Sequence, residues 1–198
     1  MTDYLRVDDI EKYYGSGTNV TKAIDRVSFR VEKGEFVGVM GASGSGKTTL
    51  LNLLATIDQV TAGHIYYETT DITELSEEEL SEFRKANLGF VFQEYNLLDT
   101  LTIEENILLA LTLQGGGREQ IERECDRMIK LLELEEIRDK FPYQVSGGQK
   151  QRCACARALV NHPRLLLADV KWSMVLIVYC VYSVQKKRKK GTLYTNRA

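Results

Sequence analysis

A glycine-rich segment in the first quarter of the chain offers the clearest chemistry. It reads Gly-Ala-Ser-Gly-Ser-Gly-Lys-Thr over residues 41–48 and matches the pattern G-x-x-x-x-G-K-[ST]. Glycines at 44 and 46 let successive backbone N–H groups turn toward one anion, because a side chain there would block its close approach. The pattern therefore predicts a site for nucleotide phosphates, formed by Gly41, Ser43, Gly44, Ser45, Gly46, Lys47, Thr48 and Thr49.

Two side chains of this segment carry specific roles in such a site. Lys47 supplies a point charge to the β- and γ-phosphates, and the Thr48 hydroxyl is a ligand for Mg²⁺. An apolar stretch at 35–40 precedes the segment and a helical pattern follows it, so a helix N-terminus adds free N–H groups and a positive dipole end. This context favours a phosphate site over a glycine-rich turn that matches by accident.

A second motif identifies a family. The stretch Val-Ser-Gly-Gly-Gln-Lys-Gln-Arg at 145–152 resembles the signature of the ATP-binding cassette (ABC) ATPases, and an apolar strand ending in Asp169 follows it. Ser146 can cap a helix whose glycines leave its N-terminus bare, which is a second phosphate-binding surface. The resemblance implies that two ATP molecules lie between two chains. Each ATP site would be completed by four residues of the partner chain: Ser146, Gly147, Gly148 and Gln149. An ordinary capped helix, with Ser146 and Gln149 as its capping box, is the alternative.

Three further positions agree with the resemblance. Gln93, which ends the apolar run Phe-Val-Phe-Gln, matches the residue that reaches Mg²⁺ and the attacking water. Asp169 matches the Walker B aspartate, which holds Mg²⁺ through water. Tyr14 matches the aromatic residue that stacks on adenine, with Tyr13 as the alternative. The resemblance thus implies ATP and Mg²⁺ as cofactors, with Thr48, Gln93 and Asp169 around the metal and Gln93 and Asp169 in the catalytic centre.

The segment at 88–107 narrows the branch. It resembles the small ATPases of lipoprotein-release and antimicrobial-peptide transporters, most of all the bacitracin-resistance type. The resemblance implies an ATP-hydrolysing subunit that forms a homodimer and drives a transmembrane permease for peptide antibiotics or lipoprotein-type substrates. It would be cytoplasmic and would contact the inner face of the cell membrane only through the permease, with no nucleic acid partner. A P-loop kinase shares the first motif but not the second.

The resemblance stops at residue 170. The family continues Asp-Glu-Pro-Thr, where the glutamate is the general base, whereas this chain reads Asp-Val-Lys-Trp from Asp169. Val170 has no proton-accepting group, and loss of a positioned base typically costs ~10²–10⁴ in rate. The D-loop and the switch histidine are not found in these 198 residues either, since His64 and His162 both precede Asp169 and match neither role. The alternative function is therefore a non-hydrolysing ATP-binding or partner-binding fragment.

The charge distribution changes at the same place. The net charge of −2 combines 19 Lys/Arg against 28 Asp/Glu in residues 1–170 with seven Lys/Arg and no acid in residues 171–198. We therefore predict an ABC nucleotide-binding domain at 1–169, with a helical subdomain at about 94–150, and a basic tail outside the family at 170–198. The abrupt boundary favours a frameshift or truncation after the Walker B aspartate. A peripheral membrane anchor, from the apolar run 174–184 and the basic run 186–190, and a nucleic-acid-binding tail are the alternatives.

The elements that position these residues alternate between strand and helix. Strands are predicted at 4–7, 23–31, 35–40 and 165–168, and helices at 48–54 and 120–134, with further helices opened by capping boxes at Ser76 and Thr102. This order predicts an α/β fold with a mainly parallel core sheet. The resemblance adds that the fold is a P-loop NTPase of ABC type, with an antiparallel β subdomain and a helical subdomain.

We expect this core sheet to be incomplete. In the family, the strand with the switch histidine lies between the strand at 35–40 and the strand at 165–168, parallel to both. A parallel neighbour needs a crossover of about a dozen residues, but only 170–173 precede the apolar run 174–184. That run is expected to form a hairpin or to extend the preceding strand, which predicts a chain that is marginally stable or unfolded alone.

Composition excludes several classes. Two prolines, 43% hydrophobic and 27% charged residues indicate a folded domain rather than a disordered chain. No apolar run approaches the ~20 residues of a spanning helix, and the first residues show no apolar secretion signal, so a cytosolic chain is expected. Cys125, Cys153, Cys155 and Cys180 lack the spacing of a metal site and are expected to be packed, reduced cysteines.

Overall fold

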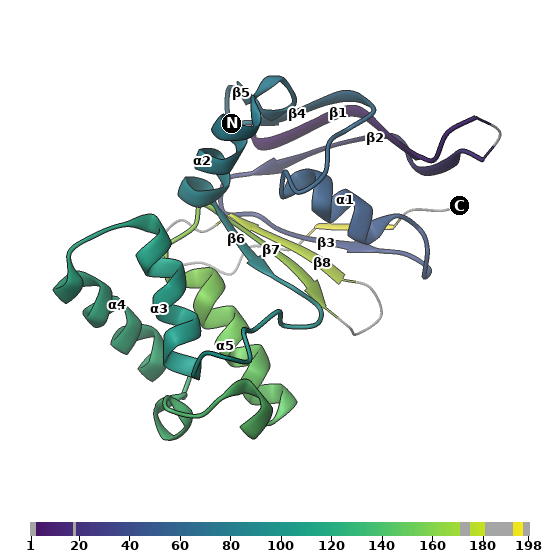
Figure 1. Cartoon of the computed structure of the whole chain (residues 1–198). Coiled ribbons are helices and arrows are strands. Elements are labelled where there is room, and N and C mark those ends of the chain that lie inside the picture. The colour runs from purple at the N-terminus through teal and green to yellow at the C-terminus, as the bar shows by residue number, and fades with distance from the viewer. Residues whose placement is uncertain (1–2, 18, 171–174, 181–191, 196–198) are drawn as a thin grey trace.

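The computed structural model describes residues 3–17, 19–170, 175–180 and 192–195 (Figure 1). The strands are β1 Asp3–Tyr14, β2 Thr21–Glu32, β3 Phe36–Met40, β4 Ala62–Tyr67, β5 Thr70–Asp71, β6 Leu88–Val91, β7 Leu165–Val170, β8 Val175–Cys180 and β9 Thr192–Thr195. The helices are α1 Lys47–Leu54, α2 Glu77–Asn87, α3 Ile103–Gln114, α4 Arg118–Leu131 and α5 Gly147–Leu159, with 3₁₀ turns at Ile72–Glu74, Glu135–Ile137 and Pro142–Gln144.

Two sheets share one hydrophobic core. The first is antiparallel in the order β2-β1-β4-β5, and the second has the order β6-β7-β8-β3-β9. Helix α1 contributes Leu50, Leu51, Leu53 and Leu54 to a buried cluster that also contains Leu5 of β1 and residues of β3 and β7. The helix that follows the glycine-rich segment is therefore held between both sheets (Figure 1).

The second sheet is parallel except for one strand. Strands β6 and β7 are parallel, as are β3 and β9, whereas β8 runs antiparallel to both of its neighbours, β7 and β3. The predicted α/β fold with a mainly parallel core sheet is confirmed, and so is the antiparallel β subdomain. The hairpin predicted after residue 170 is also confirmed for residues 175–180.

The core sheet has no gap at the expected place, but the strand there runs antiparallel to both of its neighbours. Strand β8 lies between β3 and β7, so the position is occupied, and Val178 pairs with both Val37 and Leu167. Only residues 171–174 connect β7 with β8, which is too short for a parallel crossover. The direction of β8 follows from this short connection, while the marginal stability expected of the chain stays a prediction.

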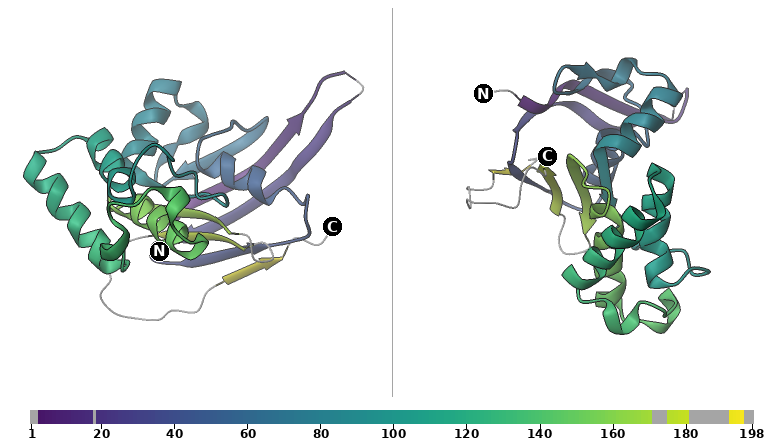
Figure 2. Two further views of the ribbon diagram at one scale, coloured as in Figure 1. Left: turned by 60° about the horizontal axis from the view of Figure 1, so that its bottom comes forward. Right: turned by 90° about the vertical axis from the view of Figure 1, so that its left-hand side faces the viewer.

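Helices α3, α4 and α5 form a group beside the sheets (Figure 2). They have a core of their own, which includes Ile107, Met128 and Cys153 and continues to Val160. Capping boxes open α2 at Ser76 and α3 at Thr102, as the sequence predicts. The helix predicted at 120–134 is confirmed as α4, shifted by two to three residues.

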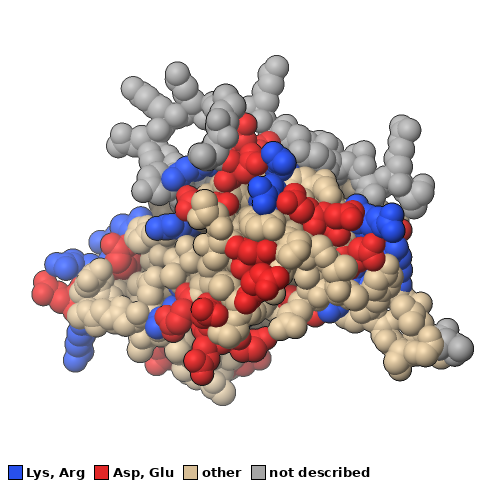
Figure 3. All heavy atoms as spheres, turned by 90° about the horizontal axis from the view of Figure 1, so that it is seen from above, with Lys and Arg blue, Asp and Glu red and all other residues tan. Residues whose placement is uncertain are grey.

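Acidic side chains are frequent on the surface. Asp and Glu side chains recur across the middle of the face seen in Figure 3, in keeping with the acidic composition of residues 1–170.

Among the described residues, none of the helices has the length and apolar character that crossing a bilayer requires.

Candidate nucleotide site

The glycine-rich loop joins β3 to α1 in a conformation that two of its glycines make possible. Gly44 and Gly46 have φ angles of 80° and 83°, in the left-handed region that L side chains rarely adopt. A Cβ on Gly46 would also lie 2.3 Å from the carbonyl oxygen of Ala23, on β2. Glycine at 46 is therefore required by its backbone angles and by the close approach of a neighbouring strand.

The loop leads directly into the free end of a helix. Gly46 is the N-cap of α1 and offers no capping side chain, so the first N–H groups of the helix are left for another acceptor. The Lys47 ammonium donates hydrogen bonds to the carbonyl oxygen of Ala42, at 2.5 Å, and to Oγ of Ser45, at 3.0 Å. Its positive charge therefore lies over the same loop.

One cavity brings these groups together with the end of β7. It measures about 430 Å³, a size suited to nucleotide phosphates. The hydroxyl of Thr48 donates a hydrogen bond of 3.1 Å to Oδ2 of Asp169. Hydroxyl, carboxylate and amide oxygens are the ligands that Mg²⁺ prefers. The cavity is lined by Thr21, Lys22, Ala23, Ser43, Gly44, Gly46, Lys47, Thr48, Thr49, Gln93 and Asp169.

Lys22 was missed by the sequence analysis. It lies at the start of β2, pairs with Asp25, and places its ammonium 5.2 Å from the ring centroid of Tyr13. The hydrogen bond with Asp25, and next the one with Tyr13, raise the pKa of Lys22 above its usual value. A second permanent cation therefore lines the cavity. No short motif marks it, because β2 is brought to the loop by tertiary packing.

The two candidate tyrosines lie differently at the end of β1. Tyr14 is 42% exposed, and its hydroxyl donates a hydrogen bond to Oδ2 of Asp58, at 2.6 Å. Tyr13 donates to Glu11. Neither ring lines the phosphate cavity itself, but Tyr13 pairs with Lys22 and Tyr14 with Thr21, and both of these β2 residues line it. The end of β1 therefore lies beside the cavity, with Tyr14 as the more exposed of the two tyrosines.

The signature segment lies on a different element. Ser146 caps α5 and forms the predicted capping box with Gln149. None of the residues 146–149 lines the phosphate cavity of their own chain, and α5 belongs to the helical group away from α1 (Figure 1). A Cβ on Gly148 would meet no described atom within 4 Å. Packing within the described part of the chain therefore does not require a glycine at position 148.

Arg157 is a second residue that the sequence analysis missed. Its guanidinium donates to the carbonyl oxygens of Tyr95, at 2.8 Å, and Asn96, at 2.5 Å, just after Gln93. Both residues have positive φ angles, 63° and 46°. Burial lowers the pKa of Arg157 below its usual value. Helix α5 thus holds the segment that carries Gln93, a contact across 61 positions that no local pattern signals.

Neither histidine takes part in the cavity. His64 lies exposed on β4 with Nδ1 2.8 Å from Asp71, and His162 lies exposed after α5 with Nε2 3.1 Å from Glu124. At the end of β7 the backbone of Val170 pairs with Val175 of β8. The position that follows Asp169 in the strand therefore holds a residue without acid–base capacity.

These features define a class and then a family. A strand, a glycine-rich loop and a helix, with an aspartate at the end of another strand of the same sheet, define a P-loop nucleotide-binding fold. The family model described as ABC transporter matches residues 24–170. The chain belongs to the ABC transporter family, as one of its ATP-binding cassettes.

Known proteins similar to the chain place it within this family. The chain is 49% identical over 165 residues to the bacitracin export ATP-binding protein BceA of Halalkalibacterium halodurans, covering 83% of this chain and 65% of that relative. It is 50% identical over 167 residues to the ABC transporter ATP-binding protein YvcR of Bacillus subtilis, covering 83% and 64%. The chain thus spans a little under two thirds of these relatives.

A solved structure agrees with the fold. The dimeric ATP-binding cassette MJ0796, in a post-hydrolysis state bound to ADP and Pi, superposes with a TM-score of 0.79 at 36% identity. The match covers 86% of this chain and 75% of that chain. Over most of its length the chain therefore has the fold of an ATP-binding cassette.

Proposed function

We propose that the chain is the ATP-binding subunit of an ABC transporter and that it holds Mg·ATP in the cavity at the start of α1. The observation that carries this proposal is the convergence of the glycine-rich loop, Gln93 and Asp169 in one cavity. Lys47 would hold the β- and γ-phosphates. Thr48, Gln93 and Asp169 would hold Mg²⁺, whose charge would offset that of the phosphates when bound.

The signature residues would act on a partner's nucleotide. The four signature residues lie outside the cavity of their own chain: Ser146, Gly147, Gly148 and Gln149. They form the N-terminus of α5, and a Cβ at Gly148 would have no described atom within 4 Å. Such an end attracts phosphate. A dimer of the kind described for MJ0796 would bring it onto the ATP of the second chain. We therefore propose a homodimer with two shared nucleotide sites.

The transported substrate is proposed from similarity. BceA, at 49% identity, is named for bacitracin export, which supports a peptide antibiotic as the substrate. A transmembrane permease would then be the second partner, and it would place the cassette at the cytoplasmic face of the membrane. The proposed cassette covers residues 1–169, with its helical subdomain at about 94–150, while residues 170–198 lie outside it.

The residue at position 170 favours a second candidate function, in which the chain binds ATP without hydrolysing it. Val170 stands where the resemblance places the general base, so this chain would bind ATP and turn it over slowly or not at all. The loss of a positioned base typically lowers the rate by ~10²–10⁴. The chain would then act as a nucleotide-dependent binding partner rather than as the source of hydrolysis.

The experiment measures binding and turnover on the purified chain. Mg·ATP affinity, the thermal midpoint with and without Mg·ATP, and phosphate release are compared with those of Lys47→Ala. Specific binding with a raised midpoint and background turnover would support the binding-only function. Turnover that Lys47→Ala abolishes would support the hydrolysing function, and binding that Lys47→Ala does not weaken would refute both.

A further inference from the structure

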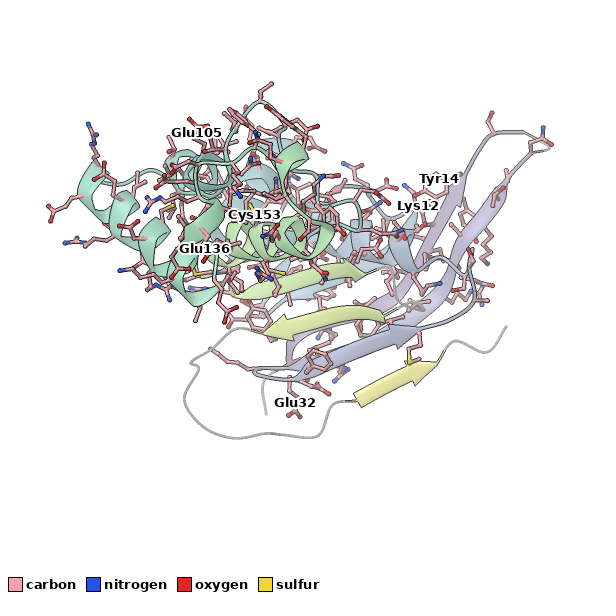
Figure 4. All side chains as sticks on the ribbon, turned by 90° about the horizontal axis from the view of Figure 1, so that it is seen from below. Lys12, Tyr14, Glu32, Glu105, Glu136 and Cys153 are labelled. Atoms are coloured by element: carbon pink, nitrogen blue, oxygen red, sulfur yellow. The ribbon has the colours of Figure 1, made fainter. Side chains whose placement is uncertain are left out.

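Three side chains join the end of β1 to the loop after α1. Oδ2 of Asp58 accepts a hydrogen bond from the Tyr14 hydroxyl at 2.6 Å, and Oδ1 accepts one from the Lys12 ammonium at 2.5 Å. The ammonium also lies 4.9 Å from the ring centroid of Tyr14. Figure 4 shows Lys12 and Tyr14 together on β1. We call Lys12, Tyr14 and Asp58 the tyrosine cluster.

We propose that Lys12 and Asp58 are positioning residues that fix the ring of Tyr14 beside the phosphate cavity, so that a nucleotide base meets a preorganised stacking face. This inference rests on the proposed function, because it concerns the base of the nucleotide whose phosphates occupy the cavity. It assigns a role to two side chains that do not line that cavity themselves.

The cluster is built as a rigid unit. The Lys12 side chain is only 12% exposed and donates a second hydrogen bond to the carbonyl oxygen of Gln59, at 2.7 Å. Oδ1 of Asp58 accepts a further hydrogen bond from the backbone N–H of Gln59, at 2.8 Å. Both carboxylate oxygens are therefore engaged, and the lysine is held from two sides. Charge-assisted hydrogen bonds of this kind are among the stronger ones in proteins.

The loop that carries Asp58 is itself anchored at both ends. The backbone N–H groups of residues 57 and 58 donate to the carbonyl oxygen of Asn52 on α1, at 2.9 and 3.2 Å. On the other side, Thr61 donates its N–H to the Glu11 carbonyl oxygen at 2.8 Å and accepts the Tyr13 N–H on Oγ1 at 3.0 Å. Strand β1 is thus fixed to the C-terminal end of the helix whose N-terminus begins at the phosphate loop.

The position of Tyr14 relative to the phosphates follows from these contacts. Tyr14 pairs in register with Thr21 of β2, and Thr21 lines the cavity. The ring is held at its hydroxyl by Asp58 and on one side by Lys12, yet Tyr14 remains 42% exposed. An exposed aromatic face with a fixed orientation binds a flat ring without the entropic cost of ordering a mobile side chain.

The test separates the base from the phosphates. Affinities for Mg·ATP and for inorganic triphosphate with Mg²⁺ are measured by calorimetry on the whole chain and on Asp58→Asn, Lys12→Met and Tyr14→Phe. We expect each variant to lose about three- to tenfold in ATP affinity, the cost of ordering one side chain. Triphosphate affinity should remain unchanged, because the phosphate loop is untouched.

A double-mutant cycle and a matched control complete the test. In a Tyr14→Ala background, Asp58→Asn should have no further effect on ATP affinity, because no ring remains to be positioned. Asp71→Asn is the control, since Asp71 has a similar exposure but bonds Thr73 and His64 away from the cavity. It should change neither affinity.

Each other outcome counts against the proposal. Equal losses of ATP and triphosphate affinity would assign the cluster to the fold alone, and an equal effect of Asp58→Asn with and without Tyr14 would overturn the positioning role. Should Asp58→Asn fail to fold, Tyr14→Phe decides by the same two affinities. If the unaltered chain binds neither ATP nor triphosphate, the proposed function is wrong. If it binds ATP and the three variants bind ATP equally well, only the positioning role is wrong.

Discussion

The hydroxyl of Thr48 hydrogen-bonds to Oδ2 of Asp169 at 3.1 Å although 121 positions separate the two residues. Thr48 lies in the first turn of α1, and Asp169 lies at the end of β7, two strands away from β3 in the sheet. Both side chains have oxygen atoms that can coordinate a hard cation, and Gln93 lines the same cavity. The pair therefore marks the place where a bound Mg²⁺ would sit.

This pair predicts how ATP binding depends on Mg²⁺. Mg²⁺ should raise the ATP affinity of the unaltered chain. In Thr48→Val and in Asp169→Asn, we expect this increase to be smaller by a factor of at least about ten. Thr48→Ser keeps the hydroxyl and should behave like the unaltered chain. ATP affinity measured with Mg²⁺ and with a chelator checks the expectation, and a Thr48→Val protein with a full Mg²⁺ effect would contradict it.

Position 170 predicts a gain of activity. Val170→Glu places a carboxylate directly after Asp169 on β7, where the resemblance locates the general base. We expect ATP turnover to rise by ~10²–10⁴ over the unaltered chain. Val170→Gln has a similar size but no base, so it should show no gain, and Lys47→Ala should cancel the gain. If Val170→Glu turns ATP over no faster than the unaltered chain, the residue at position 170 does not limit hydrolysis.

Local patterns were sufficient for the elements around the phosphate loop. The loop, its flanking strand and helix, and the capping boxes at Ser76, Thr102 and Ser146 all depend on residues close in sequence. Strand β1 was underestimated, because its pairing is irregular between Val7 and Ile10 and Asp9 has a φ of 51°. Such an irregularity breaks the alternation of apolar residues on which a strand prediction depends.

Contacts between distant segments could not be read in this way. Arg157 and Lys22 take their places through tertiary packing alone. Asn106 is another case: it is fully buried on α3 and bonds the backbone of Leu98 through both its amide oxygen and its amide nitrogen. A polar residue on an apolar helix face was the available signal, but its partner in a loop was not predictable.

Gly46 and Gly148 are expected to respond differently to substitution by alanine. Gly46→Ala should lower the free energy of unfolding by about 1–3 kcal/mol, because its φ is 83° and its Cβ would meet the Ala23 oxygen. It should also weaken ATP binding. Gly148→Ala has no described neighbour within 4 Å and lies in the first turn of α5, so stability should be unchanged or slightly higher. Urea unfolding of both proteins checks this pair, and equal destabilisation would contradict it.

Buried thiols predict a loss of stability at alkaline pH. Burial is the main reason that the pKa values of Cys125 and Cys153 are raised to about 12. The folded state thus favours the neutral thiol, so the stabilising effect is fully present below the unfolded pKa, near 9, and is lost as the pH rises toward 12. Each thiol can contribute a slope of up to about 1.4 kcal/mol per pH unit in that window.

The pH dependence of unfolding tests this expectation. The free energy of unfolding, measured in urea from pH 8 to pH 11, should fall less steeply in Cys125→Ala and Cys153→Ala than in the unaltered chain. Each variant is compared with its own value at pH 8, because removing a buried sulfur has a pH-independent cost. At pH 8 both thiols should also react with a disulfide reagent only as fast as the helical group around α3–α5 opens. A slope unaffected by either substitution, together with rapid labelling, would show that the two thiols ionise as freely in the folded chain as in the unfolded one.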